Sequence, residues 1–397
     1  MKLTTLETIR DPAATNLLWV RLHTDDGRTG LGETFRGAAA VEAHLHDHVW
    51  PYLRERHPFD LERISTDLTR PYVGARSSGA EIRAASAVDI ALWDLFAQAK
   101  GEPLWRLLGG LAHAAMPTYN TCAGPRYNAS GGRRAVGAGE RAAARYDDQI
   151  AFTTDAGALA RDLLADGIRA MKIWPFDPAA DAFEGQAVWR SEIKAAEQAV
   201  AAIRDAVGDA MEILIECHGL FEPAAARTVA EAIAPYGIFW MEDPIRLADP
   251  AALADFRRQV RVPITASETY AARAQFLDVL RAGAIDYAML DVSWCGGLTE
   301  ARKIAALADA FQRPVAPHDC TGPVVLAASL HLALATPNCV FQESVRAYYR
   351  GWYGDAVDGL PLPDGGMFAP PGGTGHGVRL AERFLARGDL GRRMSTA

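Results

Sequence analysis

Features that mark membrane, secreted and nucleic-acid-binding proteins are missing from this chain of 397 residues. No apolar run is long enough to cross a membrane, and the first residues, MKLTTLETIRDP, lack the apolar core of a signal peptide. The 41 basic and 49 acidic residues are mixed without basic blocks and give a net charge of −8. These absences disfavour membranes and nucleic acids as partners. We expect a cytoplasmic protein that acts on a small molecule.

Cysteine is scarce as well. The five cysteines are odd in number and widely spaced, which fits reduced thiols better than a disulfide framework. No cysteine and histidine quartet has the spacing of a zinc site. Hydrophobic residues, by contrast, make up 49% of the chain, which is enough for a sizeable core. The length allows a barrel of about 250 residues and a second unit.

What the chain does contain is a series of chemical groups at nearly equal intervals. Three glutamates are 26 residues apart, and an aspartate, a histidine and a glutamate follow at intervals of 23, 27 and 25. Each group stands at the end of a short apolar run, and segments with helical apolar spacing lie between the runs. Repeated βα units favour a parallel sheet, and in a (β/α)₈ barrel the carboxyl ends of the strands share one face. We therefore expect six side chains to converge: Glu216, Glu242, Glu268, Asp291, His318 and Glu343.

The convergence of several carboxylates in a partly buried site is costly unless a cation offsets their charge. Glutamate offers hard oxygen atoms, which favours Mg²⁺ over Zn²⁺. We interpret Glu216, Glu242 and Glu268 as the ligands of one Mg²⁺ ion per subunit. The alternative is that each glutamate caps a following helix or pairs with an arginine.

The first part of the chain has a different pattern. The segment TNLLWVRLHTDDGRTGLGET predicts two strands joined by a tight turn, and three helical patterns follow it. We expect an α+β domain over residues 1–115 and a barrel over residues 116–360. The tail, residues 361–397, is rich in proline and glycine, so we expect an irregular segment that packs back on the first domain.

Six segments carry a family resemblance: AASAVDIALWDLFAQAKGEPLWRLLGG at 84–110, MEDP at 241–244, ASE at 266–268, DVSWCGGLTEARKIAALA at 291–308, APHDCTGPV at 316–324 and the ending PPGGTGHGV at 370–378. Together they resemble the enolase superfamily in its mandelate racemase/muconate lactonizing enzyme-like branch. The resemblance implies an α/β fold in which an N-terminal α+β domain caps a modified TIM barrel of (β/α)₇β form. It also implies Mg²⁺ at the ends of the third, fourth and fifth strands, where the three glutamates stand, and a homo-oligomer.

The resemblance also implies the chemistry of a general base. Enolase-superfamily sites use a lysine or histidine base together with Mg²⁺, which stabilises the enediolate formed when the proton beside a carboxylate is removed. His318 is our candidate base, and Asp291 would orient its ring and stabilise its cation. The alternative is a core histidine bonded to the backbone. Glu343 would offer a hydrogen bond to the enediolate or to the substrate carboxylate.

The second strand of the barrel distinguishes between reaction types. Many relatives carry Lys-x-Lys there, with the second lysine as a base on the opposite face of the substrate. Here the strand is AMKIWPFD, so Trp174 stands in that position and cannot accept a proton. Racemisation is therefore disfavoured, and Trp174 is expected to shape the substrate pocket. Lys172 is either a charge partner of the substrate carboxylate or of a metal ligand, or a lysine paired with the barrel glutamates.

His218 supplies a second proton-transfer group. It lies two residues after Glu216, so strand alternation points both side chains to the mouth. The sequence Glu-Cys-His-Gly resembles the Asp-x-His of galactonate- and mannonate-type sugar-acid dehydratases, in which the histidine acts as acid. β-Elimination of water needs such an acid because hydroxide is a poor leaving group. The alternative role for His218 is that of a supporting hydrogen-bond donor.

Residues 123–155 are rich in glycine and arginine and lack core periodicity, so they predict a long, mobile loop at the barrel mouth. Arg126, Tyr127, Arg133 and Arg134 would meet a polyhydroxylated acid if this loop covers the substrate. The alternative is a solvated insertion without contact to the substrate.

The residues together predict a lyase of carbohydrate catabolism. We expect a Mg²⁺-dependent dehydratase that abstracts the C2 proton of an aldonate and eliminates the 3-hydroxyl to give a 2-keto-3-deoxy acid. A racemase, epimerase or cycloisomerase using the same enediolate is the first alternative. A non-catalytic, metal-dependent sugar-acid binder is the second, and the presence of both an acid and a base candidate argues against it.

Overall fold

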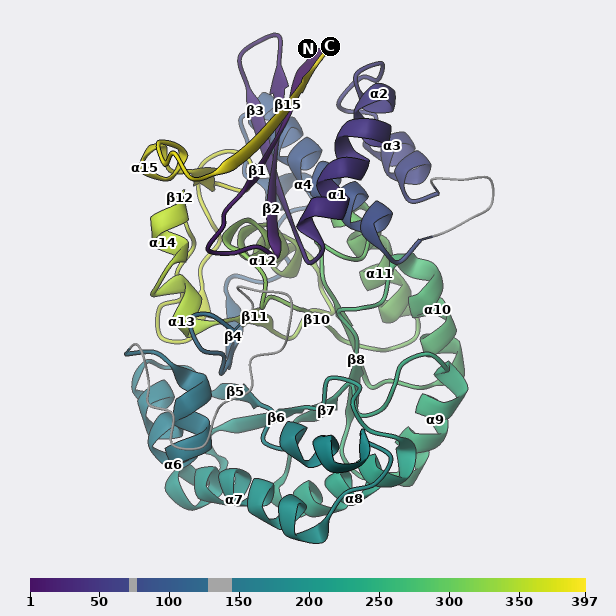
Figure 1. Ribbon diagram of the computed structural model, residues 1–397, viewed down its shortest axis with the longest axis vertical. Coiled ribbons are helices and arrows are strands. Elements are labelled where there is room, and N and C mark those ends of the chain that lie inside the picture. The colour runs from purple at the N-terminus through teal and green to yellow at the C-terminus, as the bar shows by residue number, and fades with distance from the viewer. Residues whose placement is uncertain (71–76, 128–144) are drawn as a thin grey trace.

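The computed structural model describes residues 1–70, 77–127 and 145–397, which form a capping domain above a barrel (Figure 1). The capping domain holds an antiparallel sheet in the order β15-β1-β2-β3. Its strands are β1 (Leu3–Arg10), β2 (Leu17–Thr24), β3 (Thr29–Phe35) and β15 (Gly391–Thr396). The helices that follow β3 are α1 (Ala38–His44), α2 (Trp50–Leu53), α3 (Leu61–Leu68), α4 (Ala80–Lys100) and α5 (Leu104–Leu107).

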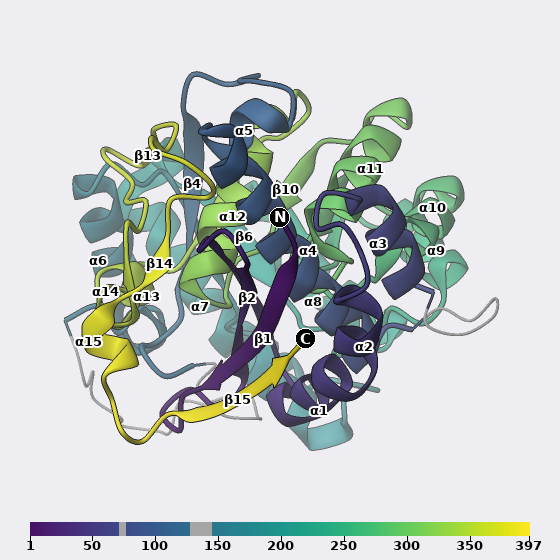
Figure 2. The same ribbon diagram turned by 90° about the horizontal axis from the view of Figure 1, so that it is seen from above.

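The hairpin predicted from the sequence is formed by β2 and β3, which pair from Leu17 with Phe35 to His23 with Thr29. The sequence pattern does not predict β1 or β15. The expectation of a wholly irregular tail is wrong at its end, because β15 pairs antiparallel with β1 (Figure 2). Nearly all of β15 is exposed, so no alternation of apolar and polar residues marks it as a strand.

Close contact between β3 and α4 holds the capping domain together. A Cβ atom added to Gly30 would lie 2.2 Å from the Ala91 carbonyl oxygen, and one added to Gly32 would lie 1.9 Å from that of Ala87. Only glycine permits the strand to approach the helix backbone this closely. The helix is alanine-rich and buried along most of its length, which makes it the central support of the domain.

The barrel follows from residue 116 as parallel strands separated by helices. The strands are β4 (Met116–Thr121), β5 (Ala170–Ile173), β6 (Glu212–Glu216), β7 (Trp240–Glu242), β8 (Ile264–Ala266), β9 (Tyr287–Leu290), β10 (Val315–Pro317) and β11 (Gln342–Ser344). They pair in chain order, and β11 returns to pair with β4. A bridge between Val315 and Cys339 lies next to the remaining gap between β10 and β11, so the barrel is nearly closed.

Helices surround the strands on the outside (Figure 1). They are α6 (Asp148–Ala165), α7 (Arg190–Val207), α8 (Pro223–Ile233), α9 (Pro250–Gln259), α10 (Ala272–Ala282), α11 (Gly297–Ala310) and α12 (Pro323–Ala335). Short helices α13 (Arg346–Tyr349) and α14 (Tyr353–Ala356) and strand β12 (Val357–Asp358) follow β11, and β13 (Met367–Phe368), β14 (Arg379–Leu380) and α15 (Glu382–Leu385) lie in the tail. The predicted fold class, an α+β capping domain over a (β/α)₇β barrel, is confirmed.

The barrel interior is filled by side chains that point inward from different strands. Its central cluster consists of Tyr119, Ala170, Leu214, Trp240, Met289 and Ala316. The Tyr119 and Trp240 rings meet edge to face with centroids 5.5 Å apart. This packed layer closes the barrel below the strand ends, so the functional groups at the strand ends stand on a rigid floor.

Within the described ranges, no helix combines the length and the apolar character needed to cross a bilayer.

Candidate active site

The six evenly spaced groups all stand at or directly after the carboxyl ends of barrel strands. Adjacent strands β6 and β7 end in register, with Glu216 opposite Glu242, and Glu268 follows β8 by two residues. The other three groups, Asp291, His318 and Glu343, belong to the ends of β9, β10 and β11. Glu268 is half-buried and the other five are buried, so the structure brings the whole series to one face.

Lys172 of β5 is the cation at the centre of this face. Its Nζ atom lies 2.7 Å from Glu242 Oε1, 2.9 Å from Glu343 Oε1 and 3.6 Å from Glu216 Oε2. The lysine is only 2% exposed, so these contacts are screened little by water. These contacts are the pairing with barrel glutamates, and because Glu216 and Glu242 are also the predicted metal ligands, they fit the role of charge partner of a metal ligand as well.

One lysine does not balance all the carboxylates around it. Burial raises the pKa of Glu216 to about 7, although the charge of Lys172 acts against this rise. Burial and the charge of Glu216 raise the pKa of Glu242 well above its usual range. Burial, Glu268 and Glu242 do the same for Asp243. A cluster in which ionised carboxylates repel one another is short of positive charge.

The donor set fits a hard divalent cation. Asp243 Oδ2 accepts a hydrogen bond of 2.7 Å from Ser267, but its buried Oδ1 has no hydrogen-bond partner among the described residues. Carboxylate oxygens without protein donors are what Mg²⁺ binds in proteins. No three acidic, histidine or cysteine side chains in residues 1–70, 77–127 and 145–397 already stand in a metal-binding arrangement. The predicted ligands are therefore gathered together, and their side chains must adjust to hold an ion.

The candidate base forms a close pair with its aspartate. His318 Nδ1 lies 2.8 Å from Asp291 Oδ2, and Asp291 Oδ1 accepts hydrogen bonds from the Ser293 backbone and hydroxyl at 2.6 and 2.7 Å. Burial lowers the pKa of His318, but the charge of Glu343, the hydrogen bond to Asp291 and the Asp291 charge outweigh it and bring the pKa to about 10. The ring therefore holds protons strongly, and its Nε2 is the nitrogen left for the substrate.

Glu343 is an ionised hydrogen-bond acceptor. Burial raises its pKa, but the charges of Lys172 and His318 and the hydrogen bond from Thr121 outweigh burial and bring the pKa to about 2. Its Oε2 accepts the Asp319 backbone N–H at 3.0 Å and lies 3.9 Å from His318 Nε2. A carboxylate in this state donates no proton. Its role is to hold Lys172 in place through their ion pair.

His218 stands in a tight turn directly after β6. Its backbone has φ 51°, in the left-handed region, and its N–H donates to Glu216 Oε1 at 2.6 Å. The ring has a partner on each nitrogen, since Nδ1 lies 2.9 Å from Asp177 Oδ2 and Nε2 lies 3.0 Å from Tyr127 Oη. The side chain is 23% exposed, so it is reachable from the mouth.

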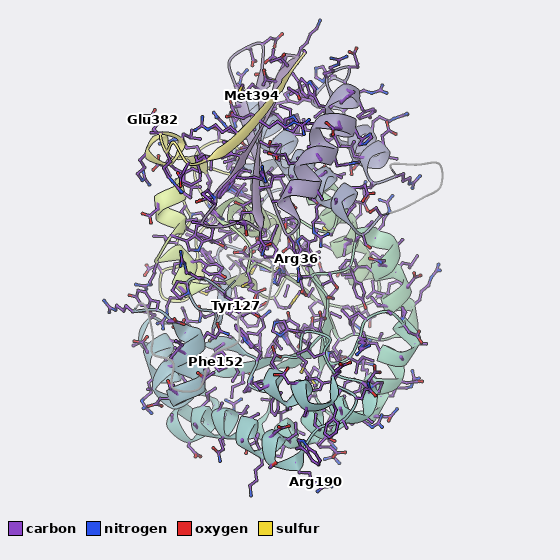
Figure 3. The ribbon with its side chains drawn as sticks, viewed as in Figure 1. Arg36, Tyr127, Phe152, Arg190, Glu382 and Met394 are labelled. Carbon is purple, nitrogen blue, oxygen red and sulfur yellow. The ribbon has the colours of Figure 1, made fainter. Side chains whose placement is uncertain are left out.

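Aromatic rings fix the remaining side of His218. The Trp174 ring lies 5.9 Å from that of His218 and 5.0 Å from that of Tyr127, and Phe152 packs against Trp174 at 5.2 Å. Figure 3 shows Tyr127 and Phe152 on the β4 and α6 side of the barrel. Trp174 is 5% exposed and therefore acts as a wall that positions the histidine.

The predicted loop over 123–155 is shorter than expected, because α6 begins at Asp148 with the Asp147 side chain as its N-cap. Arg126 is exposed and lines a cavity of about 490 Å³ that also includes Thr321 and Tyr348. Arg133 and Arg134 lie outside the described residues.

Comparisons with known proteins place the chain in a family. Residues 6–109 match the mandelate racemase/muconate lactonizing enzyme N-terminal domain, and residues 155–384 match the enolase C-terminal domain-like model. The chain belongs to the mandelate racemase/muconate lactonizing enzyme family. The resemblance inferred from sequence motifs is thereby confirmed.

Named relatives of this family member include two sugar-acid dehydratases. The chain is 32% identical to the D-gluconate dehydratase of Thermoproteus tenax over 93% of its own length and 69% of that protein. It is 31% identical to the D-galactonate dehydratase of Xanthomonas euvesicatoria pv. vesicatoria (strain 85-10), covering 98% of this chain and 94% of that one. Dehydratases are hydro-lyases, so the chain belongs to an enzyme superfamily and has lyases among its relatives.

Two solved structures of enolases are more similar in sequence. An enolase of the mandelate racemase subgroup from Agrobacterium tumefaciens is 45% identical with a TM-score of 0.89, covering 100% of this chain and 99% of that one. An enolase protein from environmental sequencing of the Sargasso Sea is 44% identical, with the same TM-score and coverage.

In this member of the mandelate racemase/muconate lactonizing enzyme family, the capping domain adds a cationic wall. The Arg83 guanidinium carbon lies 4.6 Å from the Trp294 ring centroid, and Phe35 stacks on the same indole at 6.2 Å. The Trp294 backbone N–H donates to the Asp291 carbonyl at 3.0 Å, which ties this wall to the base. Arg36 lies where the capping domain meets the barrel (Figure 3). Neither arginine has an ion-pair partner in the described part of the chain, so both offer charge to an anion.

Sequence reasoning missed Asp177, Arg83 and Trp294. Asp177 stands in the 3₁₀ helix η2 (Asp177–Phe183), outside the strand-end series, so the regular spacing does not mark it. Arg83 and Trp294 meet across the two domains, which no local pattern predicts. The available signal was Asp177 itself, an acidic residue shortly after β5. Strand β5 pairs with β6, the strand that His218 follows.

Proposed function

We propose that this chain is a Mg²⁺-dependent dehydratase that converts a sugar acid, an aldonate, to a 2-keto-3-deoxy acid. The observation that carries the proposal is the presence of two separate histidine–carboxylate pairs beside one carboxylate cluster. His318 is paired with Asp291 at 2.8 Å and His218 with Asp177 at 2.9 Å. Elimination of water needs one base and one acid, and the dehydratase relatives support that reaction class.

The first step belongs to His318. With Nδ1–H donated to Asp291, the free Nε2 takes the proton from C2 of the substrate, and the aspartate stabilises the cation that forms. A divalent cation held by Glu216, Glu242 and Glu268 would supply positive charge to the substrate carboxylate as negative charge develops on it. Lys172 adds a fixed positive charge at the same face.

The second step belongs to His218. In its cationic form the ring donates Nδ1–H to Asp177 and carries a transferable proton on Nε2. That proton passes to the 3-hydroxyl as the C3–O bond breaks, so the leaving group departs as water. The enol product then tautomerises to the 2-keto-3-deoxy acid. Trp174 stands where a second base would be needed for racemisation, which favours elimination over inversion.

The test is a screen of the purified protein with Mg²⁺ against aldonic and aldaric acids, with semicarbazide to detect 2-keto-3-deoxy products. We expect product from one or a few stereoisomers, and loss of product when EDTA removes the metal. Exchange of the C2 proton with solvent deuterium without water loss would favour an epimerase. EDTA-sensitive binding without exchange would favour a sugar-acid binder.

A further inference from the structure

The Asp177 carboxylate is a polar partner of His218 that the family resemblance does not assign. Asp177 is the first residue of η2, five residues after Lys172, and its side chain is 12% exposed. Its Oδ2 atom lies 2.9 Å from His218 Nδ1. A carboxylate of this kind can only accept, so the proton of this hydrogen bond belongs to Nδ1.

This hydrogen bond decides which ring nitrogen is left for Tyr127 and the substrate. With Nδ1 bound to Asp177, the opposite nitrogen Nε2 points to Tyr127 Oη at 3.0 Å. The ring is also held by its own backbone N–H, which donates to Glu216, and by the edge-to-face contact with Trp174. Rotation of the imidazole would break the contacts on both nitrogens, so one orientation is strongly selected.

The same architecture occurs on the other side of the barrel. His318 takes its carboxylate from the end of β9, the strand that precedes and pairs with its own strand β10. His218 follows β6 and takes its carboxylate from the segment after β5, which precedes and pairs with β6. The two Nδ1–carboxylate distances, 2.8 and 2.9 Å, are nearly equal.

We propose that Asp177 is the positioning residue of the acid, as Asp291 is of the base. It keeps the Nδ1 proton in place and orients Nε2 to the departing hydroxyl. This inference rests on the proposed function of the same site. During elimination the Nε2–H bond breaks, an O–H bond forms on the leaving oxygen, and the C3–O electron pair leaves with it. Asp177 neither gains nor loses a proton.

The first test compares Asp177→Asn with Asp181→Asn. Asp181 lies on the same 3₁₀ helix but is exposed and has no ion pair among the described residues, so its substitution is the matched control. In D₂O, we expect Asp177→Asn to slow formation of the 2-keto-3-deoxy product by about 10²-fold or more. C2 proton exchange, which depends on His318, should stay within about twofold of the wild type. Equal losses of exchange and elimination, or no loss of either, would overturn the proposal.

The second test does not require turnover. Nitrogen-15 spectra of labelled histidine, with His218 assigned by its absence in His218→Gln, report which ring nitrogen carries the proton. We expect a protonated Nδ1 in the wild type and an altered protonation pattern in Asp177→Asn, with Asp181→Asn unchanged. Spectra of His218 that are identical in Asp177→Asn and the wild type would refute the positioning role. If this readout succeeds while no sugar acid is dehydrated, the proposed function fails and the positioning role stands.

Discussion

The two histidine regions of the barrel mouth use the same pair of chemical groups but are built differently. His318 follows strand β10, its side chain is 11% exposed, and its aspartate is fully buried. His218 stands in a turn with a left-handed backbone, its side chain is 23% exposed, and its carboxylate comes from a 3₁₀ helix. The barrel strands position the side chains of the first region, whereas turns and aromatic packing position those of the second.

The difference separates the two halves of the proposed reaction. A base that removes a weakly acidic proton benefits from a rigid, buried pair whose charge is maintained by its neighbours. An acid that meets a departing hydroxyl must be reachable from the mouth, and Tyr127 and Trp174 leave the His218 ring partly open. Lys172 connects the regions, because it contacts Glu216 beside His218 and Glu343 beside His318.

The largest expected effect comes from removing the base. His318→Asn should reduce both C2 deuterium exchange and elimination by about 10³- to 10⁴-fold, because Trp174 stands where a second base would be needed. Both rates are measured by NMR in D₂O with the substrate found in the screen. His57→Asn, an exposed histidine of the capping domain, is the control and should retain both activities. Persistent exchange in His318→Asn would assign the base elsewhere.

Removing the acid should separate the two rates. His218→Asn is expected to slow elimination by about 10²- to 10³-fold and to leave C2 exchange close to the wild-type rate. A 3-deoxy-3-fluoro substrate, whose leaving group needs less protonation, should recover most of the lost elimination rate. If exchange falls as far as elimination, the two histidine regions do not act independently.

Lys172 tests the connection between the regions. Lys172→Met removes the cation from a buried cluster, so we expect the free energy of unfolding of the metal-free protein to fall by about 3–5 kcal/mol. Mg²⁺ should restore more stability to this variant than to the wild type, because it supplies the missing charge. Urea denaturation with and without Mg²⁺ measures both effects. Lys303→Met, which breaks partly exposed pairs with Glu62 and Glu300, should cost about 1 kcal/mol or less. Equal costs would contradict the central role of Lys172.

The pH profile tests the Asp291–His318 pair. A base must be unprotonated, so kcat/KM should rise with pH as His318 loses its proton. Burial lowers the pKa of His318, while Glu343 and Asp291 raise it to about 10. Asp291→Asn removes one raising charge, so the rise should move to lower pH and the maximum rate should fall. Asp309→Asn, an exposed aspartate of α11, should keep the wild-type profile. If kcat/KM rises at the same pH in Asp291→Asn as in the wild type, Asp291 does not control the protonation of the base.

The smallest expected effect lies outside both regions, at the contact between the domains. Burial raises the pKa of Glu33 to about 8, and its Oε1 accepts the Val325 N–H at the start of α12. Between the unfolded pKa and this folded pKa, the native state binds the extra proton, so stability should fall as pH rises. Between pH 6 and 8, the free energy of unfolding of Glu33→Gln should fall by about 1–2 kcal/mol less than that of the wild type. Urea midpoints at the two pH values measure this. Equal losses would mean that Glu33 does not hold a proton in the native state.

Much of the region around His318, the proposed base, can be predicted from the sequence. Little of the region around His218, the proposed acid, can. Asp291 and His318 stand at the ends of successive strands, so a regular spacing locates them and predicts that they meet. His218 is found through its two-residue distance from Glu216, but Asp177 is not, and Tyr127 is predicted only as a loop residue that would meet the substrate. Their contacts depend on a 3₁₀ helix after β5 and on the chain after β4, which no period describes.

The sequence by itself determined the repeated βα units, the family and the groups at the strand ends, because apolar periodicity and strand register are local properties. Only the tertiary structure decided that Lys172 pairs with Glu242 and Glu343, that Asp177 orients His218, and that β15 joins the capping sheet. Those contacts join residues from different units, and burial gives them their strength. Charge balance and ring orientation are therefore properties of the assembled site.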